Sequence, residues 1–563
     1  MNKRSEKGIL TKRASKDALF RVFDRGANRL LLLFLLGSIV LFVLYPILCI
    51  FLRSLHGDTG LTTVFYAEVW RKYRTNLQNS VFVGVWTSLV CTFLSVSAAL
   101  CLSTRRKRLR AVCTLLLLIT MVSPPFISSL AYIQLYGRRG WITYRLLGLT
   151  WDPYNRWGVI WMQSISFVPL NALFLRGILA KLDADSIRSA QDLGASPADI
   201  LRDVVLPLMR PGIFVCLLLS FVRSLSDFET PTIIGGRFST IASEIYLQLI
   251  GYSDLEKSSA MNLFLLLPSV AAFFLYRYLM RRCDRLTQSG SARQEPLMLS
   301  LFSCGPSGWL AAGSGALFFL MMILQYACIF ATGFLKSTKG VYHFTLEYLR
   351  KLLQYDRGTM LRSIEYALTV SLVGTLFAML FSYYMQRRSV PGRSLFDCLV
   401  TLPYMLPGSC FGIGYILAFH GAPFRMTGTA LIVLANMLFK QIPTTTKICS
   451  AALTQVPPSL ECAARDLGGG RFAVLRDVIF PSLRPAFFTC FAYHFSASMT
   501  TAGAILFLIN PGRKLAVFKL FDCVYIGEYA TAALIASWII VTVLMVEGIV
   551  YFVFRKAGGA RVF

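Results

Sequence analysis

The chain has 563 residues, of which 55% are hydrophobic, 13% aromatic and only 15% charged. A clearly positive mean hydropathy of +0.59 excludes an assembly of soluble domains. The formal net charge of +29 would fit nucleic-acid binding if it formed one basic patch, but the basic residues are dispersed along the chain. The composition therefore predicts a polytopic membrane protein.

Long apolar windows follow one another from the N-terminus to the C-terminus. Each holds roughly the 20 residues that a helix needs to cross about 30 Å of hydrocarbon. Continuous windows favour helices over a β-barrel, whose strands alternate in polarity. The expected fold is therefore an all-α polytopic membrane protein with twelve spans, at 30–53, 80–103, 111–136, 157–179, 211–234, 260–280, 309–334, 362–385, 396–418, 427–447, 485–508 and 529–555.

The basic residues gather outside these spans. With twelve spans and both termini inside, every cluster falls on the cytoplasmic side, as the positive-inside rule requires. The N-terminus is too long and too charged for a cleavable signal, so the first span is expected to remain as an anchor. The clusters are the N-terminal tail (Lys3, Arg4, Lys7, Lys12, Arg13, Lys16, Arg21, Arg25, Arg29), RRKRLR (105–110), the residues after the sixth span (Arg277, Arg281, Arg282, Arg285, Arg293), RRSVPGR (387–393) and the C-terminus (Arg555, Lys556, Arg561).

The sequence offers no assembled catalytic or metal site. The 14 cysteines show no CxxC pair and are expected to be small buried hydrophobes, with a Cys410–Cys523 disulfide as the disfavoured alternative. The chain contains no Gly-Lys dipeptide and hence no GxxxxGK[ST] phosphate loop, so it is not expected to hydrolyse ATP or to act as an enzyme. The histidines likewise lack metal-ligand spacing: His56, His343, His420 and His494.

Two polar, glycine-containing segments interrupt the apolar pattern and repeat each other. Residues 189–211 read SAQDLGASPADILRDVVLPLMRP and residues 463–485 read AARDLGGGRFAVLRDVIFPSLRP, and the two agree at 11 of 23 positions. The likeness extends upstream, where 79–106 resembles 362–388. The chain is therefore expected to be an internal duplication.

Each copy holds six of the expected spans. An even number of spans makes the two six-helix halves parallel repeats, related by a pseudo-twofold axis along the membrane normal. The expected organisation is a basic cytoplasmic N-terminal tail (1–29), a first half (30–280), a cytoplasmic linker (281–308), a second half (309–555) and a cytoplasmic C-terminal tail (556–563).

Each repeated segment is expected to form a cytoplasmic elbow, in which a glycine turn joins two helices. In the first copy, SPAD (196–199) is a helix start with a Ser N-cap and Pro at the first helical position. In the second copy GGG (468–470) replaces this cap and gives a weaker start. Gly194 and the first glycine of GGG supply the bend, and the second helix is expected to end at Pro207 or Pro481. Retention of the pattern in both halves favours a docking role over a merely solvated loop.

The two segments resemble the EAA loop of binding-protein-dependent ABC import permeases. Gly194 followed by Leu206-Pro207 fits the family pattern, and Gly468 followed by Phe480-Pro481 nearly does. The resemblance covers almost the whole chain, because fused twelve-span permeases of the ferric-iron (Fbp-like) type share the duplicated layout. They also contain stretches similar to SDFETPTIIGG (226–236) and MTTAGAILFL (499–508).

The resemblance implies the ABC type I importer permease fold, in a multi-pass protein of the bacterial plasma (inner) membrane. It implies that two ATPase subunits dock on the elbows from the cytoplasm and bind the ATP and Mg, so that this chain holds no cofactor. It also implies an extracytoplasmic solute-binding protein and ferric iron as the substrate. The coupling residues it indicates are Asp192, Leu193, Gly194, Ala195, Ser196, Asp466, Leu467, Gly468, Gly469 and Gly470.

One position departs from the family pattern. The motif's Glu is replaced by Arg188 in the first half and by Cys462 in the second, although Glu461 lies next door. Any docking contact that this Glu makes in relatives is therefore not carried over, and the two ATPase contacts are expected to be unequal.

Ionisable residues within spans are costly and mark candidate pathways. Asp227 lies about 24 Å along the helix from Pro211, and Pro231 with Gly235-Gly236 predicts a helix break there. We expect a polar lining or outer gate in which one half faces the other; the alternative is a helix-end salt bridge between Arg223 and Asp227. The candidate lining residues are Arg223, Ser226, Asp227 and Glu229, and Ser496, Ser498, Thr500 and Thr501.

The expected external loops, which the family uses to receive its binding protein, are 54–79, 137–156, 235–259, 335–361 and 509–528. Related fused permeases carry phosphonate, sugar phosphate, thiamine or polyamine, and these substrates stay open. From another class, an ion-coupled secondary transporter also has repeated halves, but it gives its cytoplasmic loops no reason to repeat a docking elbow. A membrane-embedded enzyme lacks a catalytic constellation.

Overall fold

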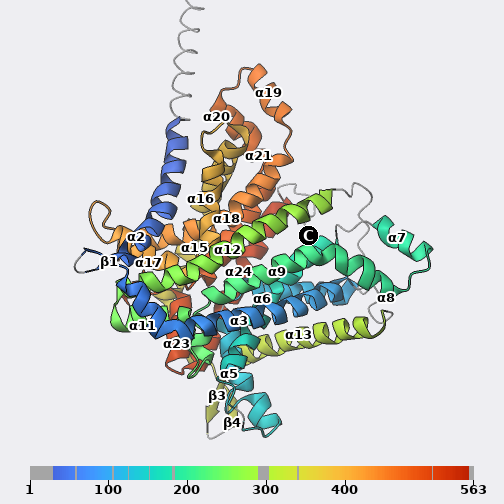
Figure 1. Ribbon diagram of the computed structural model, residues 1–563, viewed down its shortest axis with the longest axis vertical. Coiled ribbons are helices and arrows are strands. Elements are labelled where there is room, and N and C mark those ends of the chain that lie inside the picture. Colours follow the sequence, from blue (N-terminus) through green and yellow to red (C-terminus); the bar gives the residue numbers. More distant parts are fainter. Residues whose placement is uncertain are drawn as a thin grey trace, which may run out of the picture.

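A computed structural model describes residues 29–57, 60–103, 107–124, 126–150, 152–180, 184–288, 304–338, 341–509 and 511–556. Helices make up most of this part of the chain (Figure 1). Most of the expected N-terminal tail, linker and C-terminal tail lies outside the described residues. Helix α12 nevertheless continues to Gln288, inside the segment expected to be the linker.

Eight helices of the described chain are long and apolar enough to cross a membrane. They are Arg29–Ser54, which ends as α2 (Tyr45–Ser54), α3 (Val64–Leu102), α6 (Arg156–Leu179), Pro197–Ser226, which ends as α9 (Leu206–Ser226), α12 (Leu255–Gln288), α13 (Gly305–Thr332), α15 (Arg357–Arg387) and α24 (Tyr529–Lys556). The expected spans 111–136 and 396–418 are instead bent pairs of helices. The all-α polytopic fold is confirmed, but a count of twelve uniform spans is wrong.

The bent pairs occupy matching places in the two halves. Helices α4 (Lys107–Val122) and α5 (Phe126–Tyr136) belong to a pair that bends by 111°. Helices α16 (Arg393–Met405) and α17 (Gly408–Phe419) belong to a pair that bends by 112°. Each break follows from a proline near the bend, because proline cannot donate the backbone hydrogen bond that a continuous helix needs.

The two remaining expected spans do form helices, but they fail the criteria that the eight meet. Helix α18 (Ala430–Thr454) replaces span 427–447 and is too polar, with Lys440, Gln441 and a run of threonines. Helix α22 (Arg484–Thr500) has only 17 residues. It ends at Thr500, where the sequence had predicted a span that continues to 508, because the chain turns beside the Gly503 backbone.

The two halves interlock through their first spans. The helix Arg29–Ser54 packs on α16, α17 and α18 of the second half, and α13 packs on α3 and α5 of the first half. The Tyr415 hydroxyl donates to the Phe42 carbonyl oxygen at 2.8 Å, and the Tyr326 hydroxyl donates to Ser123 Oγ at 2.9 Å. Each half therefore buries a helix of the other.

The helices present two different ends (Figure 1). Helices α7 (Ala184–Asp192), α8 (Pro197–Asp199), α19 (Pro458–Asp466) and α20 (Arg471–Val474) lie toward the top and right of the view. The opposite end carries α11 (Ile241–Tyr252), α23 (Ala516–Tyr525), α14 (Glu347–Tyr355) and two antiparallel hairpins: β1 (His56–Gly57) with β2 (Gly60–Leu61), and β3 (Leu335–Thr338) with β4 (Val341–Phe344), in which Leu335 pairs with Phe344. The segments expected as external loops are thus largely folded.

Candidate functional site

The first elbow is a helix, a glycine turn and a capped second helix. Gly194 adopts φ +83°, in the left-handed region that favours glycine, and ends α7. The Ser196 and Asp199 side chains form a reciprocal capping box at the start of α8. The Ser196 hydroxyl donates to the Asp199 carboxylate at 2.6 Å and holds the pKa of that carboxyl below its usual value. Leu193 stands 88% exposed at the tip.

The second elbow repeats this shape without the cap. Gly468 has φ +85°, and Leu467 at its tip is 90% exposed. Gly470 precedes α20 and offers no side chain to the free N–H groups of the helix start. The Arg476 guanidinium beside Asp477 lowers the pKa of that exposed carboxyl. The two elbows therefore present the same apolar tip on helices of unequal anchoring.

The second helix of the first elbow does not end at Pro207, contrary to the sequence-based expectation. It continues as a single helix from Pro197 to Ser226. In the second elbow only a turn at Leu483 separates α21 (Phe480–Ser482) from α22. A wider π-helical turn precedes each proline and accommodates a residue that has no N–H to donate: η3 (Ile200–Val205) and η5 (Leu475–Ile479). Each elbow is thus joined rigidly to a span.

The residues at the family's Glu position point outward, and the neighbouring acid points inward. Arg188 and Cys462 are exposed. Glu461 is only 5% exposed and forms ion pairs with Arg387, at the end of α15, at 3.2 Å and with Arg465 at 3.4 Å. The Arg387 guanidinium also donates to the Leu453 carbonyl oxygen at 2.9 Å. Glu461 therefore fastens α19 to its own half.

In the middle of the helices, α9 breaks at Asp227. Asp227 is extended (φ −81°, ψ 109°), and its carboxylate accepts hydrogen bonds from the backbone N–H groups of Glu229 and Thr230 at 2.9 and 3.1 Å. It thereby caps α10 (Glu229–Ile234), whose first turn tolerates Pro231. The break predicted at Pro231 and Gly235-Gly236 lies earlier, because the carboxylate rather than the proline starts the new helix.

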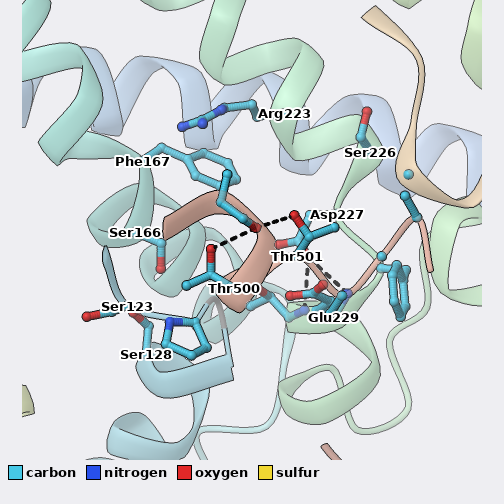
Figure 2. Close-up of a pocket in the computed structure, with 18 of the residues that line it drawn as sticks. Ser123, Ser128, Ser166, Phe167, Arg223, Ser226, Asp227, Glu229, Thr500 and Thr501 are labelled. Carbon is cyan, nitrogen blue, oxygen red and sulfur yellow. Dashed lines mark hydrogen bonds between the residues drawn. The ribbon is translucent and has the colours of Figure 1, made fainter. Parts of the chain in front are cut away.

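The alternative salt bridge between Arg223 and Asp227 is wrong. Gln163 Nε2 donates to the other Asp227 carboxylate oxygen at 2.9 Å. The Arg223 guanidinium instead lies over the Phe167 ring, 5.7 Å from its centroid. Figure 2 shows Arg223 above Phe167 and apart from Asp227.

A cavity of about 450 Å³ opens at this break, between the two halves. The breaks of α4–α5, α9–α10 and α16–α17 and the end of α22 all contribute to its wall. In Figure 2, Thr500 and Thr501 lie beside Asp227 and Glu229, and Ser123, Ser128 and Ser166 lie on the facing wall. Broken helices at mid-membrane are where transporters of several folds place their solute sites. Of the sequence-predicted lining residues, the cavity brings together Arg223, Ser226, Asp227, Glu229, Thr500 and Thr501.

Ser496 and Ser498, by contrast, are buried away from the cavity. The Ser498 hydroxyl lies 3.3 Å from the side-chain amide of Gln441. The first half has the same arrangement, where the Ser224 hydroxyl donates to Gln163 Oε1 at 2.6 Å. These paired networks brace the fourth and fifth spans of each half against each other, behind the cavity wall.

The cavity also contains a cation that the sequence reasoning missed. Lys440 of α18 donates to the carbonyl oxygens of Pro403 and Leu406, at 2.8 and 2.6 Å, and so satisfies the broken end of α16. A lysine inside an apolar window was the available signal. Beside it, a Cβ on Gly408 would lie 3.0 Å from the Gly503 carbonyl carbon, so this contact requires glycine.

Glu229 is the carboxylate that the fold leaves open. It is 9% exposed, and no described side chain or backbone group forms a hydrogen bond or ion pair with its carboxylate. Asp227, in contrast, is engaged by the cap and by Gln163. The cavity therefore presents one uncompensated carboxylate, one guanidinium on an aromatic ring, and a wall of hydroxyl groups.

The chain belongs to the family of binding-protein-dependent transport system inner membrane components, whose model matches it twice, at residues 91–285 and 371–562. It is thus a permease component of an ABC importer with both copies fused in one chain, and not an enzyme. It is 26% identical over 531 residues to the ferric transport system permease protein FbpB of Actinobacillus pleuropneumoniae, covering 92% of this chain and 76% of that protein.

Other relatives have different printed substrates. A putative ferric transport system permease protein FbpB 1 of Haemophilus influenzae is 27% identical over 86% of this chain and 78% of its own length. The sulfate permease CysT of Salmonella typhimurium (31%) and the molybdenum permease ModB of Mycobacterium bovis (33%) match only 32% and 35% of the chain, and 69% and 76% of their own lengths. Family membership implies a multi-pass inner-membrane protein that works with an ATPase and a solute-binding protein.

Proposed function

We propose that this chain forms the path by which ferric iron crosses the membrane. The observation that supports it best is the cavity between the halves, where broken helices from both copies meet around the open Glu229 carboxylate. A wall of carboxylate and hydroxyl oxygens suits a hard cation. The relatives that match along most of the chain are ferric transport permeases.

The two elbows are the coupling sites of the proposed transporter. Their exposed tips, Leu193 and Leu467, offer apolar anchors for two ATPase subunits. Asp192, Ala195 and Ser196 flank the first tip, and Asp466, Gly469 and Gly470 flank the second. Since α8 continues rigidly into α9, a displacement at the first elbow reaches the Asp227 break without passing through a flexible joint. ATP and Mg bind to the ATPase subunits and not to this chain.

The proposed orientation places the elbows and both termini in the cytoplasm. The basic clusters at helix ends favour this side for the elbows. The hairpins, α11, α14 and α23 then face outward and receive the binding protein. The linker and the two tails would also be cytoplasmic.

Reconstitution tests the substrate and the coupling together. The complex of this chain with its ATPase and ferric-binding protein is placed in liposomes, and ATP hydrolysis is measured with ferric-loaded, sulfate-loaded or molybdate-loaded binding proteins. Ferric-loaded protein is expected to stimulate hydrolysis and uptake. Stimulation by an oxyanion alone would refute ferric transport. Transport that follows an ion gradient in the absence of ATP would favour the secondary-transporter alternative and refute the coupling role.

A further inference from the structure

A second cavity, of about 410 Å³, lies apart from the path between the halves. Helix α12 of the first half and α15, α16 and α18 of the second half enclose it. Its polar lining consists of Tyr276, Arg277, Asp397, Thr401, Lys447 and Ser450. Neither the transport path nor the elbows use these residues, so the cavity calls for a different occupant.

The cavity has an excess of positive charge. Arg277 and Lys447 face it from different halves, and no carboxylate of the described residues lies within 4 Å of either cation. Asp397 is already paired with Arg393 at 3.7 Å. The Lys447 ammonium has only the Tyr404 ring as a neighbour, at 5.8 Å from its centroid. Two unpaired cations between membrane helices are costly unless an anion joins them.

The rest of the wall is apolar, and it adjoins a lipid-facing surface. Phe273 and Met280 of α12 and Phe381 and Met385 of α15 line the cavity beside the cations. The adjacent face of α12 exposes a row of large apolar side chains: Leu267, Phe274, Leu275 and Tyr278. A ligand that fits this wall has an anionic head and a long apolar tail.

The depth of the cavity agrees with such a ligand. Arg277 stands near the basic end of α12, and Lys447 stands two turns before the end of α18, which leads into the second elbow. In the proposed orientation this is the cytoplasmic leaflet. Anionic lipids give that leaflet its negative surface potential, and basic pockets between helices bind their headgroups.

We propose that this cavity binds the phosphate headgroup of an anionic phospholipid. Arg277 and Lys447 hold the phosphate, and Thr401 and Ser450 supply hydroxyl donors. The acyl chains follow the apolar face of α12. Because the two cations belong to different halves, the bound lipid bridges α12 to α18 at the interface between the halves.

Native mass spectrometry of the purified full-length chain in detergent tests the site. Phosphatidylglycerol is titrated onto the wild-type protein, the double variant R277Q/K447Q and a control, R350Q/R357Q, which removes two exposed charges at the opposite end. Removing two lipid-facing cations is expected to weaken binding by about tenfold or more. The control is expected to bind as the wild type does. Equal binding by R277Q/K447Q and wild type would overturn the proposal.

Two further arms identify the ligand and protect against misfolding. Inorganic phosphate at the same concentrations is expected to compete poorly; competition as strong as that of phosphatidylglycerol would show a soluble-phosphate site and overturn the lipid assignment. If R277Q/K447Q does not fold, T401V/S450A keeps both charges and the side-chain volumes. It is then expected to weaken binding severalfold, and unchanged binding would refute the site.

Discussion

Two carboxylates two residues apart have different tasks in the central cavity. Asp227 is consumed by structure, because it caps α10 and accepts from Gln163. Glu229 is open to the cavity. Replacing Glu229 with Gln keeps its shape and removes its charge, so we expect uptake to fall at least about tenfold while assembly with the ATPase is retained. Radiolabelled iron uptake and co-purification measure the two effects. The control is Glu244→Gln, outside the cavity; normal uptake by E229Q would remove Glu229 from the path.

Asp227 separates capping from charge. Asp227→Asn preserves an acceptor for the N–H groups of Glu229 and Thr230, whereas Asp227→Ala removes it at about 1 kcal/mol. We therefore expect the Ala variant to lower the thermal unfolding midpoint more than the Asn variant does. Equal midpoints would show that the cap is not what holds this break. Uptake is expected to be impaired in D227A.

At the scale of elements, the elbows depend on one backbone conformation. Gly194 and Gly468 have φ above +80°, which proline cannot adopt. Gly194→Pro or Gly468→Pro is therefore expected to abolish ATP-driven uptake and leave membrane insertion intact. Gly358→Pro is the matched control, because it lies in the first turn of α15, where proline is tolerated. Uptake at the wild-type rate by either elbow variant would contradict the coupling role.

The caps make the elbows unequal. Loss of the Ser196 cap in Ser196→Ala should cost about 1 kcal/mol and speed hydrogen exchange across 197–205 roughly fivefold. Because the folded pKa of Asp199 is lowered, its contribution is complete above its usual pKa and is lost as the pH falls through the lowered value. Exchange measured at neutral and acidic pH checks this. Equal protection of the two elbows in the wild type would contradict the asymmetry.

At the scale of the whole molecule, the halves are held together by exchanged first spans. A protease site placed between 289 and 303 is expected to cut the chain without separating the halves, because Arg29–Ser54 and α13 each pack on the other half. Size-exclusion chromatography after cleavage checks this. Elution of two separate fragments in mild detergent would show that the interlock is too weak to hold the permease together.

The sequence by itself determined the membrane class, the duplication, the glycine bends and the cap at Ser196. These rest on local physics, namely hydropathy, backbone freedom and side-chain bonds within a few residues. Resemblance to the family added the coupling role. The sequence also selected Arg223, Asp227, Glu229, Thr500 and Thr501, because polar groups in apolar windows are costly.

Only the tertiary structure decided where those groups meet. The cap by Asp227, the inward pairing of Glu461 and the anchoring by Lys440 all use partners far along the chain or an unforeseen helix start. The bent pairs and the short α22 likewise form because their polar breaks gather around one cavity. A window of hydropathy measures greasiness along the chain, and it contains no information on which buried polar group finds which partner.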